Sequence, residues 1–139
     1  MSSANLDLVR SIYAAWEHGD FGSLDWAHPE IEFVIVGGPD PGNWTGLTGM
    51  ADGWRGWLSA WENYAAQADE YHDLDGQRVL ALGRMSGRGK ASGVHVETEF
   101  ANVFQISGGK VVRLRLYSSR VHALADLGLD EQAVSPNYS

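Results

Sequence analysis

The sequence predicts a single α+β domain over residues 1–139, in which a curved, cone-shaped antiparallel β-sheet wraps around three N-terminal helices. Two observations lead to this prediction. The length of 139 residues fits one compact domain and leaves too little chain for two. Helical periodicity is concentrated in the first half of the chain and strand-like segments with tight turns fill the second half, an order that favours α+β over alternating βαβ units.

The helical patterns begin near the N-terminus. Apolar residues three and four positions apart predict a helix over residues 5–19, with Asn5 as its N-cap, and another over residues 46–64 whose buried face is mostly indole. Residues 21–27 predict a short helix or a turn, because the residue before Pro29 avoids the helical region. These three segments are expected to cover one face of the sheet.

Strands are predicted where β-branched and aromatic residues alternate between turn signals. Their expected bounds are residues 30–36, 65–73, 77–86, 94–106 and 110–118, followed by a closing helical turn over 120–127. The glycine- and proline-rich segment 37–42 is predicted to be a long, mobile loop.

Charge and composition exclude several classes of function. A formal charge of −8 and a pI near 4.9 disfavour binding to nucleic acid or to anionic membranes. The chain has no cysteine, which excludes disulfides and thiolate chemistry. Its polar N-terminus and the lack of a long apolar stretch predict neither a signal peptide nor a membrane span, so we expect a cytoplasmic protein.

The register of two hairpins predicts which side chains meet the helices. A three-residue turn at Ser107 to Gly109 pairs Asn102 with Leu114. Alternation then places one set on an apolar face, namely Phe100, Asn102, Phe104, Leu114 and Leu116. The opposite face receives Glu97, Glu99, Arg113, Arg115 and Tyr117, a surface that suits a homodimer interface.

The Asp75-Gly76 hairpin is the second register. Taking both residues as the centre of the turn pairs Tyr71 with Leu80, Asp69 with Leu82 and Gln67 with Arg84. Asp69, Tyr71 and Arg84 then border the interior. A shift by one residue would instead turn Glu70 and His72 inward.

Four segments resemble a known superfamily. They are Tyr-Ala-Ala-Trp-Glu-His-Gly-Asp at 13–20, His-Pro-Glu-Ile-Glu-Phe at 28–33, Arg-Val-Leu-Ala-Leu-Gly-Arg at 78–84 and Gly-Gly-Lys-Val-Val-Arg at 108–113. The chain resembles the nuclear-transport-factor-2-like superfamily and, within it, the SnoaL-like group of polyketide cyclases, ketosteroid isomerases and limonene-epoxide hydrolases. The resemblance implies a cone fold with an apolar cavity, dimerisation through the outer sheet face, and chemistry without a cofactor.

The candidate catalytic residues are Asp69, Arg84 and Tyr13. Asp69 would act as a general base held by Arg84, while Tyr13 and Asn102 would donate hydrogen bonds to a substrate oxygen. The alternative is a structural Asp69–Arg84 ion pair. Compared with ketosteroid isomerases, the chain has Ile35 at the position of their general-base aspartate. Asn102 stands at or near the position of their second, hydrogen-bonding aspartate. Against epoxide hydrolases Arg84 matches their arginine, but Ser86 and Leu116 stand at about the positions of the flanking acids.

The aromatic residues predict a ligand pocket. Its expected ligand-binding residues are Trp16, Trp44, Trp54, Trp57, Tyr71, Thr98 and Asn102, with Trp44 as a lid; the alternative is that the indoles are ordinary core. His95, Glu97 and Glu99 share a strand face and could in pattern ligate a metal. Only one of the three is a histidine, which is a poor match to common metal sites, so no metal is expected. The expected partner is a small apolar or aromatic molecule. Binding with acid–base isomerase or cyclase chemistry, binding alone, and a dimeric assembly module remain open.

Overall fold

The computed structural model describes residues 3–36, 41–117 and 119–128. The elements in chain order are α1 (Ser3–Glu17), β1 (Ala27–Val36), β2 (Gly42–Thr45), α2 (Gly46–Ser59), β3 (Trp61–Asp73), β4 (Arg78–Gly89), β5 (His95–Ser107), β6 (Lys110–Tyr117) and α3 (Arg120–Asp126). Of the predicted mobile loop at 37–42, residues 37–40 lie outside the described residues. The predicted α+β class is confirmed.

The six described strands form one curved, open sheet in the order β2-β1-β6-β5-β4-β3. All neighbouring strands are antiparallel except β1 and β6, which run parallel. The sheet is therefore mixed, which corrects the expectation of a purely antiparallel one. The parallel neighbours β1 and β6 are joined by a long crossover connection, which contains β2, α2 and β3 to β5.

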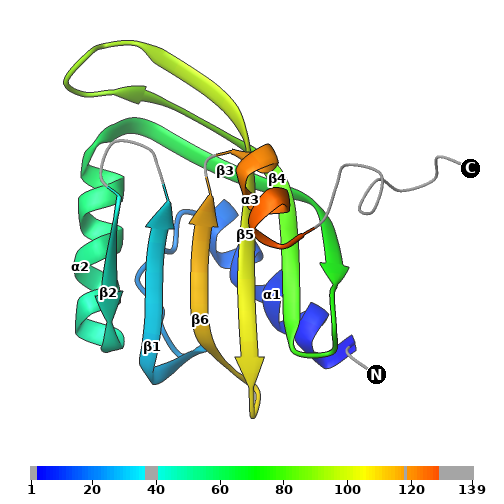
Figure 1. Cartoon of the computed structure of the whole chain (residues 1–139). Helices are drawn as coiled ribbons and strands as arrows, with labels where there is room; N and C mark the ends of the chain where they lie inside the picture. The colour runs from blue at the N-terminus through cyan, green and yellow to red at the C-terminus, as the bar shows by residue number, and fades with distance from the viewer. Residues whose placement is uncertain (1–2, 37–40, 118, 129–139) are drawn as a thin grey trace, which may run out of the picture.

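Helices cover both faces of the sheet rather than one. Figure 1 shows α1 behind the sheet and α3 in front of it. On the α1 and α2 side, which we call the inner face, the core includes Ile12, Phe33 and Phe104; on the outer face, α3 packs Leu124 over a smaller cluster that contains Leu82. The prediction of three N-terminal helices is thus wrong, because residues 21–24 are irregular, Asp25 and Trp26 form a turn, and the third helix follows the last strand.

Helix α2 ends at Ser59, five residues before the predicted end. The helical spacing of Trp57, Trp61 and Tyr64 misled the prediction, since these rings do contact each other, with centroids 5.7 and 6.1 Å from Trp57. A β-bulge between Glu62 and Ala65 in β3 brings them together instead. Asn63 in this bulge has a φ of 56°, a left-handed conformation that asparagine tolerates better than most residues.

The β3–β4 register agrees with the prediction at one pair and then departs from it. Gln67 pairs with Arg84 as expected, but a bulge between Ala68 and Glu70 shifts the next pairs, so that Tyr71 faces Ala81. Asp69 is the extra residue of this bulge. Tyr71 consequently packs against the inner core, as predicted, whereas Asp69 points to the outer face.

The β5–β6 hairpin keeps the predicted faces despite a shifted register. Asn102 pairs with Leu116 rather than with Leu114, and a bulge follows Gln105. A shift by two residues leaves every side chain on its predicted face, so Asn102 and Phe104 point toward the helices.

Candidate functional site

A small cavity lies between α1, α2 and the inner face of the sheet. It has a volume of about 20 Å³. Seven aromatic rings contribute to its walls: Tyr13, Trp16, Trp54, Trp57, Tyr64, Phe100 and Tyr117. In this measure a single water needs about 10–15 Å³, so the space holds about one water molecule. Of the predicted ligand-binding residues, Trp16, Trp54, Trp57 and Asn102 line this cavity, as does the predicted catalytic residue Tyr13, but the interior is nearly filled by the indoles themselves.

One polar pair borders this cavity. Asn102 is the buried polar residue of the described core, and its Nδ2 donates a 2.6 Å hydrogen bond to the Tyr13 hydroxyl. Burial raises the pKa of Tyr13 well above its usual value, so this hydroxyl keeps its proton. Whichever end of the amide faces Tyr13, the pair retains at least one unused donor, because Asn and Tyr together carry three N–H or O–H groups.

Two indole N–H groups add further unused donors. Trp54 and Trp57 are 4% and 3% exposed, and their Nε1 atoms have no acceptor within hydrogen-bonding geometry among the described residues. Burial raises the pKa of Tyr64, and the proximity of the Trp57 indole opposes this rise. The Trp57 indole lies near the Tyr64 hydroxyl without forming a hydrogen bond of normal geometry. Trp54 is therefore the clearer unpaired donor of the two. Buried donors without partners are uncommon and mark a place where a ligand or water can be accepted.

A wider groove of about 620 Å³ adjoins the cavity and shares Trp16, Tyr64, Ala66 and Met85 with it. Its lining residues come from both faces of the sheet, Phe21 and Tyr64 on the inner side and Glu99 on the outer side. A single small molecule would therefore occupy only part of it. The aromatic part beside Trp16 and Tyr64 is the direct approach to the cavity.

The predicted Asp69–Arg84 pair forms, but not at the cavity. Arg84 Nε donates to Asp69 Oδ2 over 3.0 Å, and this hydrogen bond raises the pKa of Arg84. The two side chains are 37% and 65% exposed, on the outer face. The expectation that both border the interior is wrong, since the bulge at Asp69 turns its carboxylate outward; Arg84 lines the outer part of the wide groove. This position supports the structural reading of the pair.

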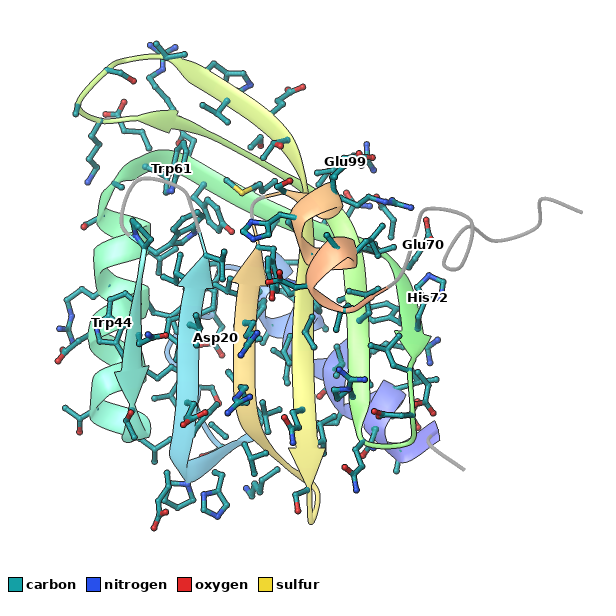
Figure 2. The ribbon with its side chains drawn as sticks, viewed as in Figure 1. Asp20, Trp44, Trp61, Glu70, His72 and Glu99 are labelled. Carbon is teal, nitrogen blue, oxygen red and sulfur yellow. The ribbon has the colours of Figure 1, made fainter. Side chains whose placement is uncertain are left out.

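Three predicted ligand-binding residues lie outside the cavity lining. Trp44, a residue of β2, packs between Phe33 and the backbone of α2 (Figure 2). Tyr71 stands edge-on to Tyr13, with ring centroids 6.0 Å apart. The guanidinium of Arg10 lies over the Tyr71 ring. Thr98 lines the wide groove. The predicted lid role of Trp44 has no geometric support, because its ring fills the gap that Gly53 leaves open.

The sequence patterns missed Tyr64, Met85 and Phe100 as cavity residues. The helical spacing extends the predicted helix to Tyr64, whereas the alternation of Ala66 and Ala68 with Gln67 and Asp69 that follows it is typical of a strand.

No group of three metal-ligating side chains gathers among the residues with described positions. His95 Nε2 instead lies 3.2 Å from Glu97 Oε2 as a surface pair. In the same parts of the chain, no helix is long and apolar enough to cross a membrane.

Solved structures with the same fold cover nearly the whole chain. Bal32a, from a soil-derived mobile gene cassette, is 19% identical, with a TM-score of 0.75 and coverage of 90% of this chain and 96% of its own. An NTF2-like protein from Burkholderia thailandensis is 24% identical, with a TM-score of 0.74 and coverage of 87% and 95%. TerC, co-crystallised with polyporic acid, is 21% identical, with a TM-score of 0.72 and coverage of 89% and 97%.

At these identities the structural likeness concerns the fold. Among curated proteins, no sequence matches the chain. The family model of the SnoaL-like domain matches residues 9–114, which include most of α1, all of α2, the strands β1 to β5 and the first part of β6. The chain belongs to the SnoaL-like domain family.

Proposed function

We propose that this SnoaL-like domain binds a small aromatic molecule that carries a hydrogen-bond acceptor, such as a carbonyl or phenolic oxygen. The observation that supports the proposal most strongly is that residues with unused donors line an aromatic cavity. Tyr13 and Asn102 retain at least one donor, and Trp54 contributes an unpaired N–H. Aromatic walls favour a flat ring system, and the donors favour an oxygen on that ring.

The proposal is for binding rather than proton abstraction. The described lining of the cavity contains no carboxylate and no imidazole, so it offers no ordinary general base. Tyr13 can polarise a bound carbonyl through a hydrogen bond, which is the one catalytic role that its position supports. One structural neighbour, TerC, has been crystallised with a small molecule, polyporic acid.

Entry of such a ligand requires a side chain to move. The cavity of about 20 Å³ cannot hold an aromatic ring, whereas the adjoining groove of about 620 Å³ can. Tyr64 lines both spaces and follows the left-handed Asn63 in a bulge of β3. We propose that rotation of Tyr64 joins groove and cavity, so that the ligand replaces its ring against Trp16.

Tryptophan fluorescence can test this proposal. The protein would be titrated with pairs of similar shape, each pair an aromatic ketone or quinone and the corresponding hydrocarbon. We expect saturable quenching by the oxygenated member and at least fivefold weaker binding of the hydrocarbon, about 1 kcal/mol for one hydrogen bond.

Two variants sharpen the test. Asn102→Leu should weaken the preference for the oxygenated member, and the double variant Tyr13→Phe with Asn102→Leu should weaken it further, whereas Trp44→Phe, outside the cavity, should keep it. Equal affinity of wild-type protein for both members of every pair would contradict the assigned role of the donors, and no binding of any pair would contradict the function itself.

A further inference from the structure

Three arginines converge on the outer face of the sheet, away from the aromatic cavity. Strand register places Arg78 opposite Gln105, and Gln105 opposite Arg113, in one row across β4, β5 and β6. Arg115 follows in the next row, opposite Val103. These residues line a pocket of about 130 Å³, together with Asp126 at the end of α3 and the following Leu127.

This gathering of cations is unexpected in a protein with eighteen acidic and ten basic residues. Cations on a sheet surface usually alternate with acids directly across the strands, because like charges opposite each other are unfavourable. Here the central partner of both Arg78 and Arg113 is the neutral Gln105. The lining therefore carries three guanidinium groups and one carboxylate, that of Asp126.

The neighbouring acids hold two of the arginines in place. Arg78 Nε donates to Asp75 Oδ2 over 2.8 Å, and Arg113 Nη2 lies 2.6 Å from Glu32 Oε1. Neither Asp75 nor Glu32 belongs to the pocket lining. Each pair leaves part of the guanidinium fork unused, since a guanidinium carries five N–H donors.

Arg115 differs from the other two arginines. Among the residues that the structure describes it forms no ion pair, and its one side-chain hydrogen bond is a long contact of 3.4 Å from Nη1 to the Tyr117 hydroxyl. Its Nε is buried and has no acceptor. Asp126, the carboxylate of the lining, is already engaged, because its Oδ2 accepts the Tyr117 O–H over 2.8 Å and lies 3.8 Å from His122 Nε2.

We propose that this pocket, formed by Arg78, Gln105, Arg113 and Arg115, binds a small oxyanion, the carboxylate or phosphate group of a small molecule. The unused donors of the guanidinium forks match the paired oxygens of such a group. The pocket volume of about 130 Å³ suits one such group, given that a water needs about 10–15 Å³ in the same measure. The arginines lie on the sheet face opposite the aromatic cavity, while Tyr117 lines both spaces, and the proposal goes beyond the function proposed above.

The test uses inorganic phosphate and acetate as probes, with chloride at equal ionic strength as reference. Side-chain Nε–H signals of arginine and the amide signals of Gln105 would be followed by ¹H–¹⁵N NMR. We expect saturable shifts of the Arg115 and Gln105 signals with phosphate or acetate and no saturation with chloride. Saturation by phosphate alone would identify a phosphate group as the ligand, and saturation by acetate alone a carboxylate.

Variants distinguish the pocket from general attraction of anions. Arg115→Gln should weaken phosphate or acetate binding at least tenfold, and Arg115→Lys, which keeps the charge but loses the fork, should also weaken it if the glutamine variant does not fold. Arg55→Gln is the matched control, since Arg55 is an exposed arginine of α2 paired with Asp52, and it should bind as wild type. Equal binding by the Arg115 variants would overturn the proposal.

The same face was predicted to form a homodimer, and light scattering separates the two cases. A mass near 15.2 kDa with saturable phosphate or acetate shifts supports the oxyanion site. A doubled mass that Arg115→Gln returns to the monomer value would instead make the arginines part of a protein interface and would overturn the proposal.

Discussion

Tyr13 and Asn102, 89 positions apart in the chain, are joined by a 2.6 Å hydrogen bond inside the domain. Tyr13 comes from α1 and Asn102 from β5, so the bond ties the first helix to the centre of the sheet. Both side chains border the aromatic cavity, at 1% and 7% exposure. One pair of residues therefore serves the stability of the fold and the polarity of the candidate site.

Tyr13→Phe should destabilise the protein by about 1–3 kcal/mol, because the buried amide of Asn102 loses its partner. The free energy of unfolding from urea titration measures this loss. The double variant Tyr13→Phe with Asn102→Leu should lose less free energy of unfolding than the two single variants lose together, since neither polar group is then left unpaired. Simple additivity would show that the hydrogen bond contributes nothing.

Gly83→Ala should destabilise the protein by about 3 kcal/mol or more, because overpacking that displaces backbone is costly. A Cβ at Gly83 would lie 2.1 Å from the Gln67 carbonyl oxygen and 2.6 Å from Phe100 Cζ. Gly22→Ala is the control, as the nearest atom to its Cβ is Asp20 Oδ1 at 3.9 Å. Urea midpoints of the two variants should differ clearly, and similar midpoints would mean that β3 and β4 lie further apart than described.

Alkaline pH should unfold the protein together with tyrosine ionisation. Burial raises the pKa of Tyr13, Tyr64, Tyr71 and Tyr117 above the usual value near 10. Above about pH 10 the unfolded chain loses these protons first, so stability falls as pH rises toward the folded-state pKa values. Tyrosinate absorbance and circular dichroism should change in one transition. Full ionisation of these four residues in a protein with native dichroism would contradict their burial.

Acid should weaken the turn between β3 and β4. Asp75 accepts hydrogen bonds from the backbone N–H of Gln77 at 3.0 Å and of Arg78 at 2.9 Å. The bond from Gln77 is the largest cause of the lowered pKa of Asp75. Because that pKa is depressed, the contribution is complete above about pH 4, the unfolded value, and is lost as pH falls through the folded value.

Asp75→Asn should therefore reduce the difference in stability between neutral and acid solution. Thermal midpoints at pH 7 and pH 2 measure that difference, and amide exchange at Gln77 and Arg78 localises it. Asp52→Asn, which removes an exposed helix ion pair with Arg55, is the control. An unchanged acid dependence in the Asp75 variant would remove the role given to this turn.

Periodicity predicted the main helices and strands because each buries one face. It placed Phe100, Asn102 and Phe104 on the inner face correctly, even though the hairpin register is shifted by two. It could not predict the bulge at Asp69, because a bulge adds one residue without changing the apolar pattern on either side. That single residue decides whether the Asp69 carboxylate meets the cavity or the solvent.

Sequence patterns could not predict the size of the cavity either. The sequence indicates that Trp54 and Trp57 face inward, and they do. Whether indoles line a hollow or fill it depends on their rotamers and on a few ångströms of helix position, which composition does not determine. The strand β2, only four residues long, and the parallel pairing of β1 with β6 also carried no local signal.

The parallel neighbour of β1 has a consequence for synthesis of the chain. Residues 32–36 obtain their partners from residues 113–117, so a ribosome must release most of the protein before this sheet can close. Until then β1 has only the short β2 beside it and leaves its apolar residues open to association with other chains. A nascent chain halted before β6 would therefore be a natural client for chaperones, and acquisition of protease resistance should coincide with emergence of the last strand.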